Sequence, residues 1–158
     1  MIPLFKVFMS DTVTDEIPKI LTSGFIGQGP QVEKFEGLLK KYFNNEYVAT
    51  TNAATSAEHI AIHMLKKPMG DIEVGDQILS TPLTCTATNW PILANGVDIK
   101  WVDVDPNNCN MDLDDLERKI TSTTKAIIGV HWGGYPLDLD RIKKIQRKWQ
   151  DLYGFFPP

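Results

Sequence analysis

The stretch Lys125-Ala-Ile-Ile-Gly-Val130, followed by an amphipathic segment over residues 139–152, indicates the fold more clearly than any other part of the sequence. The hexapeptide is a short apolar run of the kind that forms a buried strand. Apolar side chains then recur at helical spacing, at Leu139, Ile142, Ile145, Trp149 and Leu152. Gly154 is placed to end that helix. The two segments together read as one strand–helix unit.

Similar units precede it along the chain. Strands are predicted at residues 47–51, 76–80 and 98–104, and helices over residues 55–65, 84–94 and 112–120. Asp112 is suited to cap the last of these helices, and Pro30 to begin an earlier one. Four consecutive strand–helix units predict an α/β fold: a mainly parallel sheet with flanking helices, whose ligands bind beyond the carboxyl ends of the strands.

Composition narrows the class of protein. The chain has 158 residues, a formal net charge of −4 and 42% hydrophobic residues, which suits one globular domain. We expect neither nucleic-acid binding, because no basic patch is present, nor membrane association, because no apolar run is long enough to span a bilayer. The N-terminal residues lack the features of a signal peptide, and the chain has only two cysteines. A cytoplasmic location is therefore expected.

The loops after the predicted strands carry the candidate functional residues. Thr51-Asn-Ala-Ala-Thr-Ser56 lies between a strand and a helix, where backbone N–H groups and small side chains suit a phosphate. The hydroxyls of Thr55 and Ser56 would add donors. Thr55 could instead be an ordinary helix cap that needs no ligand. Spacing alone leaves both interpretations open.

Other motifs give weaker signals. The glycine run at 24–29 follows no strand, so it is a poor dinucleotide fingerprint. His59 and His63 share a helix but lack the glutamate of a zincin, and residues 103–108 lack the glycine of a calcium loop. Cys85 has no base beside it in the sequence. We therefore expect no specific metal site.

A longer pattern emerges when the motifs are taken in order. They are Ser23-Gly-Phe-Ile-Gly-Gln-Gly-Pro30, Asn52-Ala-Ala-Thr-Ser-Ala57, Thr84 with Ala87-Thr88, Val102-Asp-Val-Asp105, and Val130-His131 with Gly134 and Pro136. This ordered set resembles the DegT/DnrJ/EryC1/StrS aminotransferases over essentially the whole chain. The resemblance implies a fold-type I transferase that uses pyridoxal 5′-phosphate and works as a homodimer. It would transfer an amino group, usually from glutamate, to a nucleotide-linked keto-sugar.

The resemblance also assigns roles by position. Ala54, Thr55 and Ser56 would hold the cofactor phosphate. Cys85 stands where the family usually has an aromatic side chain against the pyridoxal ring, so this sequence departs from the pattern there. Phe25, Ile26 and Gly27 would lie near the sugar substrate and the dimer interface.

Two family elements lie beyond this chain. The acidic residue that pairs with the pyridine nitrogen is expected past Pro158, and the lysine that carries the cofactor further on. Residues 1–158 are therefore interpreted as part of the major domain, with no catalytic residue, and as inactive alone. The alternatives are a non-catalytic binding or dimerisation module of the same fold, and an unrelated doubly wound nucleotide-binding domain.

Overall fold

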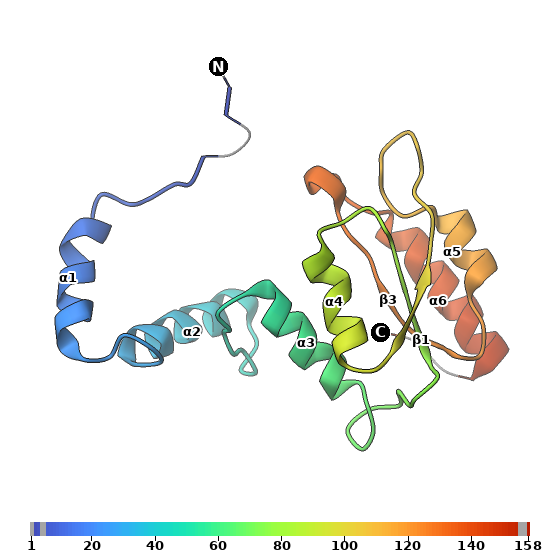
Figure 1. The fold of residues 1–158 in the computed structure, drawn as a ribbon, viewed down its shortest axis with the longest axis horizontal. Helices are drawn as coiled ribbons and strands as arrows, with labels where there is room; N and C mark the ends of the chain where they lie inside the picture. The colour runs from blue at the N-terminus through green and yellow to red at the C-terminus, as the bar shows by residue number, and fades with distance from the viewer. Residues whose placement is uncertain (1, 4–5, 155–157) are drawn as a thin grey trace. The chain divides into compact units, whose positions relative to one another are not determined.

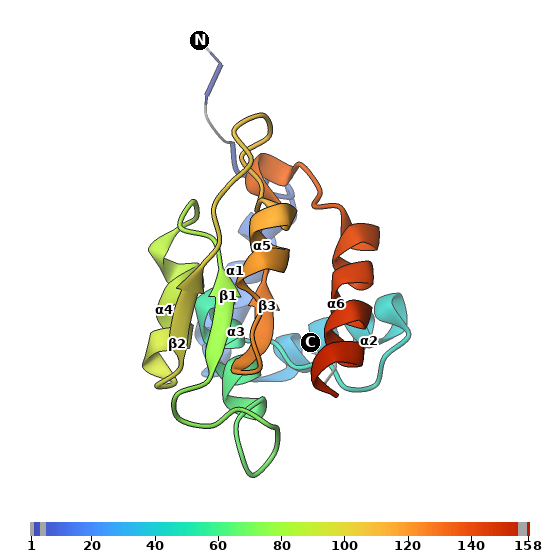
Figure 2. The same cartoon turned by 90° about the vertical axis from the view of Figure 1, so that its right-hand side faces the viewer.

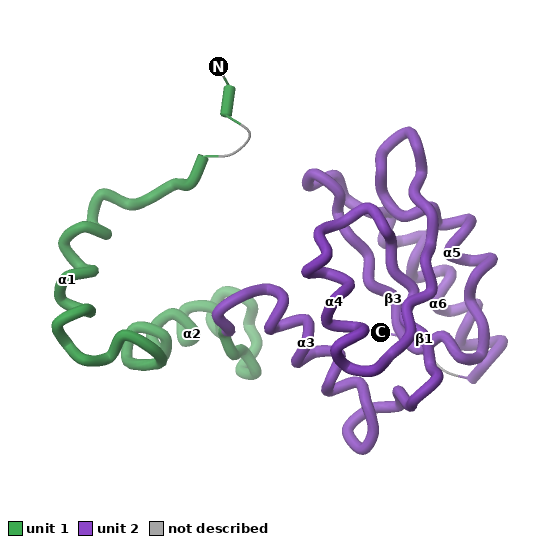
Figure 3. The backbone as a smooth tube through the Cα atoms, in the orientation of Figure 1, with its two compact units in different colours: residues 1–50 green, residues 51–158 purple. Residues whose placement is uncertain are grey.

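A computed structural model describes residues 2–3, 6–154 and 158, as Figure 1 shows. The chain divides into two compact units, residues 1–50 and residues 51–158 (Figure 3). The first unit holds two helices, and the second holds the sheet with its helices.

The first unit consists of α1 (Val13–Ser23) and α2 (Pro30–Phe43). Pro30 begins α2, as predicted, because its fixed φ suits a first helical turn. Glu36 on α2 accepts hydrogen bonds from the Thr50 backbone N–H at 2.7 Å and the Thr50 hydroxyl at 2.9 Å. The backbone bond first, and then the hydroxyl bond, hold the Glu36 pKa below its usual value. These bonds fasten the end of this unit to α2.

The second unit is built on a parallel sheet of β1 (Gln77–Ser80), β2 (Asp98–Trp101) and β3 (Thr124–Ile128) in the order β2-β1-β3. Ile78 and Leu79 on the central strand are both fully buried. Successive side chains of a strand point to opposite faces, so each face of the sheet has its own core.

Helices form a layer on each face. They are α3 (Ala54–Met64), α4 (Thr86–Ala94), α5 (Leu113–Lys119) and α6 (Leu139–Tyr153). Figure 2 shows α4 on one side of the sheet and α6 on the other. Leu79 packs with Leu116 and Ile145 of α5 and α6, whereas Ile78 packs with Ile62 and Ile92 of α3 and α4.

The predicted strand at residues 47–51 is wrong, and so is the expectation of four strands. These residues pair with no other strand in the part of the chain that the structure describes, which contains three strands. A β-prone run becomes a strand only when its backbone groups meet a partner, and the Thr50 N–H bonds to the Glu36 carboxylate instead.

The predicted helix ends are largely confirmed. Asp112 caps α5 by accepting from the backbone N–H groups of Asp114 at 2.8 Å and Asp115 at 3.2 Å. Gly154 ends α6 with a left-handed φ of 69°. The fourth helix begins at Thr86, two residues later than predicted, and continues past Pro91.

The buried carboxylate of Asp115 makes stability depend on pH. Burial alone would raise its pKa. The Asp103 backbone N–H at 2.8 Å and the Lys119 ammonium at 2.7 Å outweigh burial, and the pKa is lowered. A lowered folded-state pKa contributes stability above the unfolded value of about 3.9, and that stability is lost as pH falls through the folded value.

Replacing Asp115 with Asn should therefore reduce the free energy of unfolding near neutral pH, by about 1–3 kcal/mol, and flatten its decline in acid. Urea unfolding at neutral and acidic pH measures both effects. The exposed Asp140→Asn variant is the control and should change little. An Asp115→Asn variant with the wild-type acid decline would contradict this assignment.

An apolar groove beside β3 predicts self-association. It measures about 190 Å³ and is lined mainly by Ala61, Ile62, Leu65, Ile78, Ala126, Ile127 and Ile128. β3 is an edge strand, and Pro158 lines the groove and accepts from the Ile127 N–H at 3.4 Å. An apolar segment of a second chain can add to this edge and groove. Light scattering of the 158-residue chain should show a mass that rises with concentration. A constant monomer mass at high concentration would refute the prediction.

Candidate cofactor site and substrate pocket

The start of α3 presents free backbone donors. Ala53 precedes the helix in an extended conformation, with φ −158° and ψ 153°, and no side chain caps it. Within the described ranges, the N–H groups of Ala54 and Thr55 have no hydrogen-bond partner, while the Ser56 N–H bonds back to the Ala53 carbonyl at 3.1 Å. Two free N–H groups at the positive end of a helix form a donor set that suits a phosphate.

Thr55 does not act as the helix cap, so that alternative is wrong. Thr55 is the second residue of α3, and the alanine at the cap position has no polar side chain. Nearby hydroxyls shape the loop instead. Thr51 donates to the Ala53 carbonyl at 2.8 Å, and Ser56 donates to the Asn52 side-chain oxygen at 2.9 Å. These bonds leave the helix N-terminus open to a ligand.

A pocket of about 310 Å³ adjoins this end of α3. It is lined by Thr55, Ser56, His59 and Ile60 of α3 and by Trp90 and Pro91 of α4. Trp90 is 59% exposed, a large exposed fraction for an aromatic residue on a packed helix. Sequence reasoning missed Trp90. The sequence feature that could have indicated it is a large aromatic residue in the helix that follows the Cys85 loop.

Cys85 occupies the start of α4. It is the cap residue of that helix, its backbone is extended, and its thiol is exposed. Asn89 anchors this helix start to the end of β1, accepting from the Ser80 hydroxyl at 2.6 Å and donating to the Thr81 carbonyl at 3.1 Å. Cys85 does not line the pocket that contains Thr55.

The loop after β3 is also held firmly. Asn110, 4% exposed, accepts from the Trp132 N–H at 2.9 Å and donates to the Tyr135 carbonyl at 3.0 Å. The Leu137 N–H donates to His131 Nδ1 at 3.0 Å, so a neutral His131 ring carries its hydrogen on Nε2. Because β1 and β3 are neighbours in a parallel sheet, this loop and the Cys85 loop emerge at the same edge.

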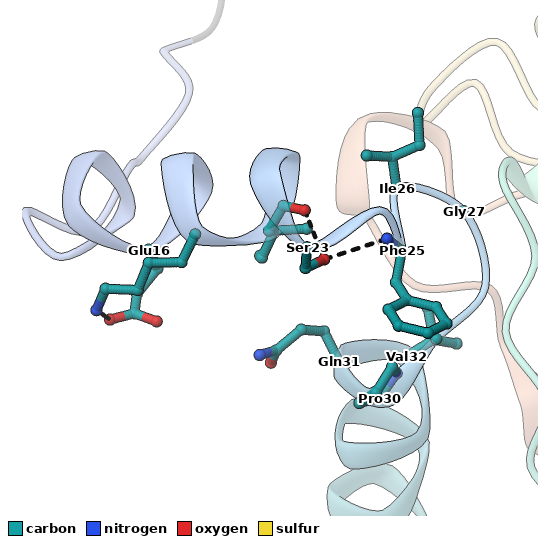
Figure 4. A pocket seen from close by; sticks show the side chains of 11 residues that line it. Glu16, Ser23, Phe25, Ile26, Gly27, Pro30, Gln31 and Val32 are labelled. Atoms are coloured by element: carbon teal, nitrogen blue, oxygen red, sulfur yellow. Dashed lines mark hydrogen bonds and ion pairs between the residues drawn. The ribbon is translucent and has the colours of Figure 1, made fainter.

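The first unit contains a separate pocket. Phe25, Ile26 and Gly27 line a cavity of about 290 Å³ with residues of α1 and the start of α2 (Figure 4). The Phe25 ring lies toward the first turn of α2, and Ile26 points the other way. A Cβ at Gly29 would lie 3.1 Å from the Phe25 Cβ, so glycine permits this close approach. The Glu16–Lys19 ion pair, 2.6 Å long, supplies charge at one end.

In the portion of the chain that the structure describes, no three potential metal-binding side chains gather. The calcium-like segment is a turn stabilised by its own side chains, because Asp105 Oδ1 accepts from the Asn107 backbone N–H at 2.8 Å and side-chain N–H at 2.9 Å. Across the same described residues, the helices are too short or too polar to cross a membrane.

Comparison with known proteins gives a consistent result. The model of the DegT/DnrJ/EryC1/StrS aminotransferase family matches residues 9–152. The crystal structure of AtS13 from Actinomadura melliaura is 50% identical with a TM-score of 0.89, and the match covers 99% of this chain and 41% of that one.

Two further relatives show the chemistry found among similar proteins. E. coli GDP-4-keto-6-deoxy-D-mannose-3-dehydratase with bound hydrated pyridoxal phosphate is 28% identical at a TM-score of 0.81, over 90% of this chain and 37% of that one. The 3-oxo-glucose-6-phosphate:glutamate aminotransferase of Bacillus subtilis is 29% identical, over 94% of this chain and 33% of its own length.

The chain thus spans about 33–41% of these relatives. Its free helix N-terminus fits the phosphate of pyridoxal phosphate, the cofactor bound in one of those solved structures. With a family match over most of its length, the chain belongs to the DegT/DnrJ/EryC1/StrS aminotransferase family.

Proposed function

We propose that this chain forms the cofactor-phosphate-binding part of an aminotransferase that transfers an amino group from glutamate to a nucleotide-linked keto-sugar. The observation that carries the proposal is the uncapped start of α3, where Ala54 and Thr55 offer free N–H groups. Family membership excludes the alternative of an unrelated nucleotide-binding domain.

In this proposal each residue of the cofactor site has a definite task. The N–H groups of Ala54 and Thr55 and the Thr55 hydroxyl bind the phosphate, and the helix dipole adds attraction for its charge. The Ser56 hydroxyl joins them when it turns toward the phosphate from the Asn52 side-chain oxygen, to which it donates in this structure. The Cys85 sulfur packs against the pyridoxal ring, a weaker contact than an aromatic face would make. Pyridoxal phosphate supplies the electron sink for amino-group transfer.

The pocket of the first unit is proposed to contact the sugar. Phe25 and Ile26 are 61% and 73% exposed there, so their apolar surface is available to a ligand. Gly27 leaves room there, since no atom beyond its two chain neighbours lies within 4 Å of where its Cβ would stand. A nucleotide-linked keto-sugar is supported by the likeness to the GDP-4-keto-sugar dehydratase, and glutamate by the likeness to the Bacillus enzyme.

Further parts of the proposal concern the whole protein. We place residues 1–158 in the major domain of a homodimeric, cytoplasmic enzyme whose acidic and lysine residues belong to later strands. The free thiols of Cys85 and Cys109 are consistent with a reducing compartment. The 158 residues alone are expected to show no turnover, because they supply no catalytic residue.

The test uses the natural protein at full length. With pyridoxal phosphate, glutamate labelled at nitrogen and a panel of nucleotide-linked keto-sugars, mass spectrometry should find label in an aminated sugar and 2-oxoglutarate in equal amount. Absence of labelled product from every sugar, with the cofactor bound, would contradict the proposed reaction. For the 158-residue chain, turnover with one stoichiometrically labelled lysine after borohydride treatment would contradict its inactivity.

A further inference from the structure

Two helices share the proposed cofactor, and their relative placement determines whether both can contact it. In the proposed function, the phosphate binds at the start of α3, which follows Ala53, and the ring packs near Cys85, the residue before α4. One rigid ligand spans both helix starts only if the helices keep a fixed offset. This requirement rests on the proposed function, and the contacts between α3 and α4 must meet it.

A single buried amide joins them. Asn95, 5% exposed, caps the C-terminus of α4. Its side-chain nitrogen donates to the Pro91 carbonyl of α4 at 2.8 Å and to the His59 carbonyl of α3 at 3.1 Å, and it lies 3.4 Å from His59 Nδ1. In the reverse amide orientation, Oδ1 would face both carbonyl oxygens, so the network requires the nitrogen here.

The rest of the contact between the two helices is less directional. Among the described residues, Asn95 is alone in joining α3 to α4 through a side-chain hydrogen bond. Apolar packing of Ile62 and Ile92 accounts for the helix contact nearer the sheet. Apolar packing allows one helix to slide slightly along the other. A hydrogen bond to one particular carbonyl does not, because it weakens steeply with distance and angle. The His59 carbonyl lies about one helical turn after Ser56.

We infer that Asn95 is a positioning residue for the cofactor: it fixes the phosphate-binding start of α3 relative to the Cys85 start of α4. Asn95 touches neither the phosphate nor the ring. It acts through the His59 carbonyl, and its own carbonyl also accepts from the Lys66 ammonium, which follows α3 in the chain. Losing Asn95 should leave each helix start intact and uncouple the two.

Two ligands distinguish binding at the start of α3 alone from binding that involves the starts of both α3 and α4. Inorganic phosphate needs only the start of α3. Pyridoxine 5′-phosphate adds the ring without the aldehyde, so it cannot label lysines. In an amide NMR titration of the wild-type chain, pyridoxine 5′-phosphate should shift Ala54–Ser56 and Cys85–Thr86 with one affinity, about tenfold tighter than inorganic phosphate, for about 1.4 kcal/mol of added contact.

The decisive variant is Asn95→Leu, because leucine is similar in size to asparagine. The substitution removes only the side-chain hydrogen bonds. The backbone N–H at position 95 still bonds to the Pro91 carbonyl. Asn95→Ala is the second variant if leucine does not fit. Both should bind inorganic phosphate like the wild type, yet lose the tenfold preference for pyridoxine 5′-phosphate. The shifts at Cys85–Thr86 should disappear.

Asn45→Leu on the exposed end of the first unit is the matched control and should retain the preference. A merely structural role would change both affinities together, or neither. Asn95 variants that keep the wild-type preference would overturn the inference and leave the proposed function standing. A wild-type chain without phosphate shifts in α3 would overturn the proposed function, and the inference with it.

Discussion

Replacing Trp149 with Ala should lower the free energy of unfolding of the chain by about 3–5 kcal/mol. Among the described residues, Trp149 is the largest fully buried one, at 1% exposure, and it lines a cavity with Ile120 and Ile145. Removing the ring adds the cost of a cavity to the lost transfer free energy. Domains of this size are stable by only about 5–15 kcal/mol, so the loss is a large fraction of the total.

The matched control lies on the same helix. Leu152 is 65% exposed, so Leu152→Ala should change the free energy of unfolding by less than about 0.5 kcal/mol. Urea unfolding followed by circular dichroism measures both variants. Equal destabilisation by the two substitutions would contradict the burial of Trp149.

Replacing Thr55 with Glu should affect stability and phosphate binding in opposite directions. A carboxylate in the first turn of an uncapped helix interacts favourably with the dipole, which should add about 0.3–1 kcal/mol to the free energy of unfolding. The same carboxylate competes for the free N–H groups of Ala54 and residue 55, and it repels an anion. We expect phosphate affinity to fall by at least about tenfold, or about 1.4 kcal/mol.

Phosphorus NMR of inorganic phosphate measures the affinity, and urea unfolding measures the stability. Thr123→Glu introduces the same charge at an exposed position outside the site and should retain phosphate binding. Undiminished binding in Thr55→Glu, or an equal loss in Thr123→Glu, would mean that the phosphate binds elsewhere or responds only to net charge.

Local signals account for what the sequence predicts correctly. The strands that include Ile78 and Ala126 contain short apolar runs, and in the strand that includes Ile99 charged and apolar residues alternate. Asp112 and Gly154 mark helix ends through their own chemistry. The segment at 47–51 has the same local signal, but a strand also depends on a partner that local sequence does not reveal. The helix α1 was not predicted, although Val13, Ile17, Ile20 and Leu21 recur at helical spacing; Pro18 lies inside it.

The residues of the candidate site also fall into two groups, those that local sequence indicates and those that it does not. The loop at 51–56 is recognisable because small residues and hydroxyls lie directly before and at the start of a helix. Asn95 and Asn110 could not be found in advance, because their partners lie 36 and 22 residues away in the sequence. Trp90 joins Thr55 in one pocket only through the packing of α4 on α3. Tertiary packing therefore determines the residues that support the site, while local sequence indicates the donors themselves.

The phosphate site is the central claim, and an amide NMR titration of the wild-type chain with inorganic phosphate tests it most directly. A few charge-assisted hydrogen bonds should give a dissociation constant on the order of 1 mM, which corresponds to about −4 kcal/mol. The amides of Ala54–Ala57 should shift first and saturate together. Shifts confined to another region, or no saturable shift in α3, would contradict it.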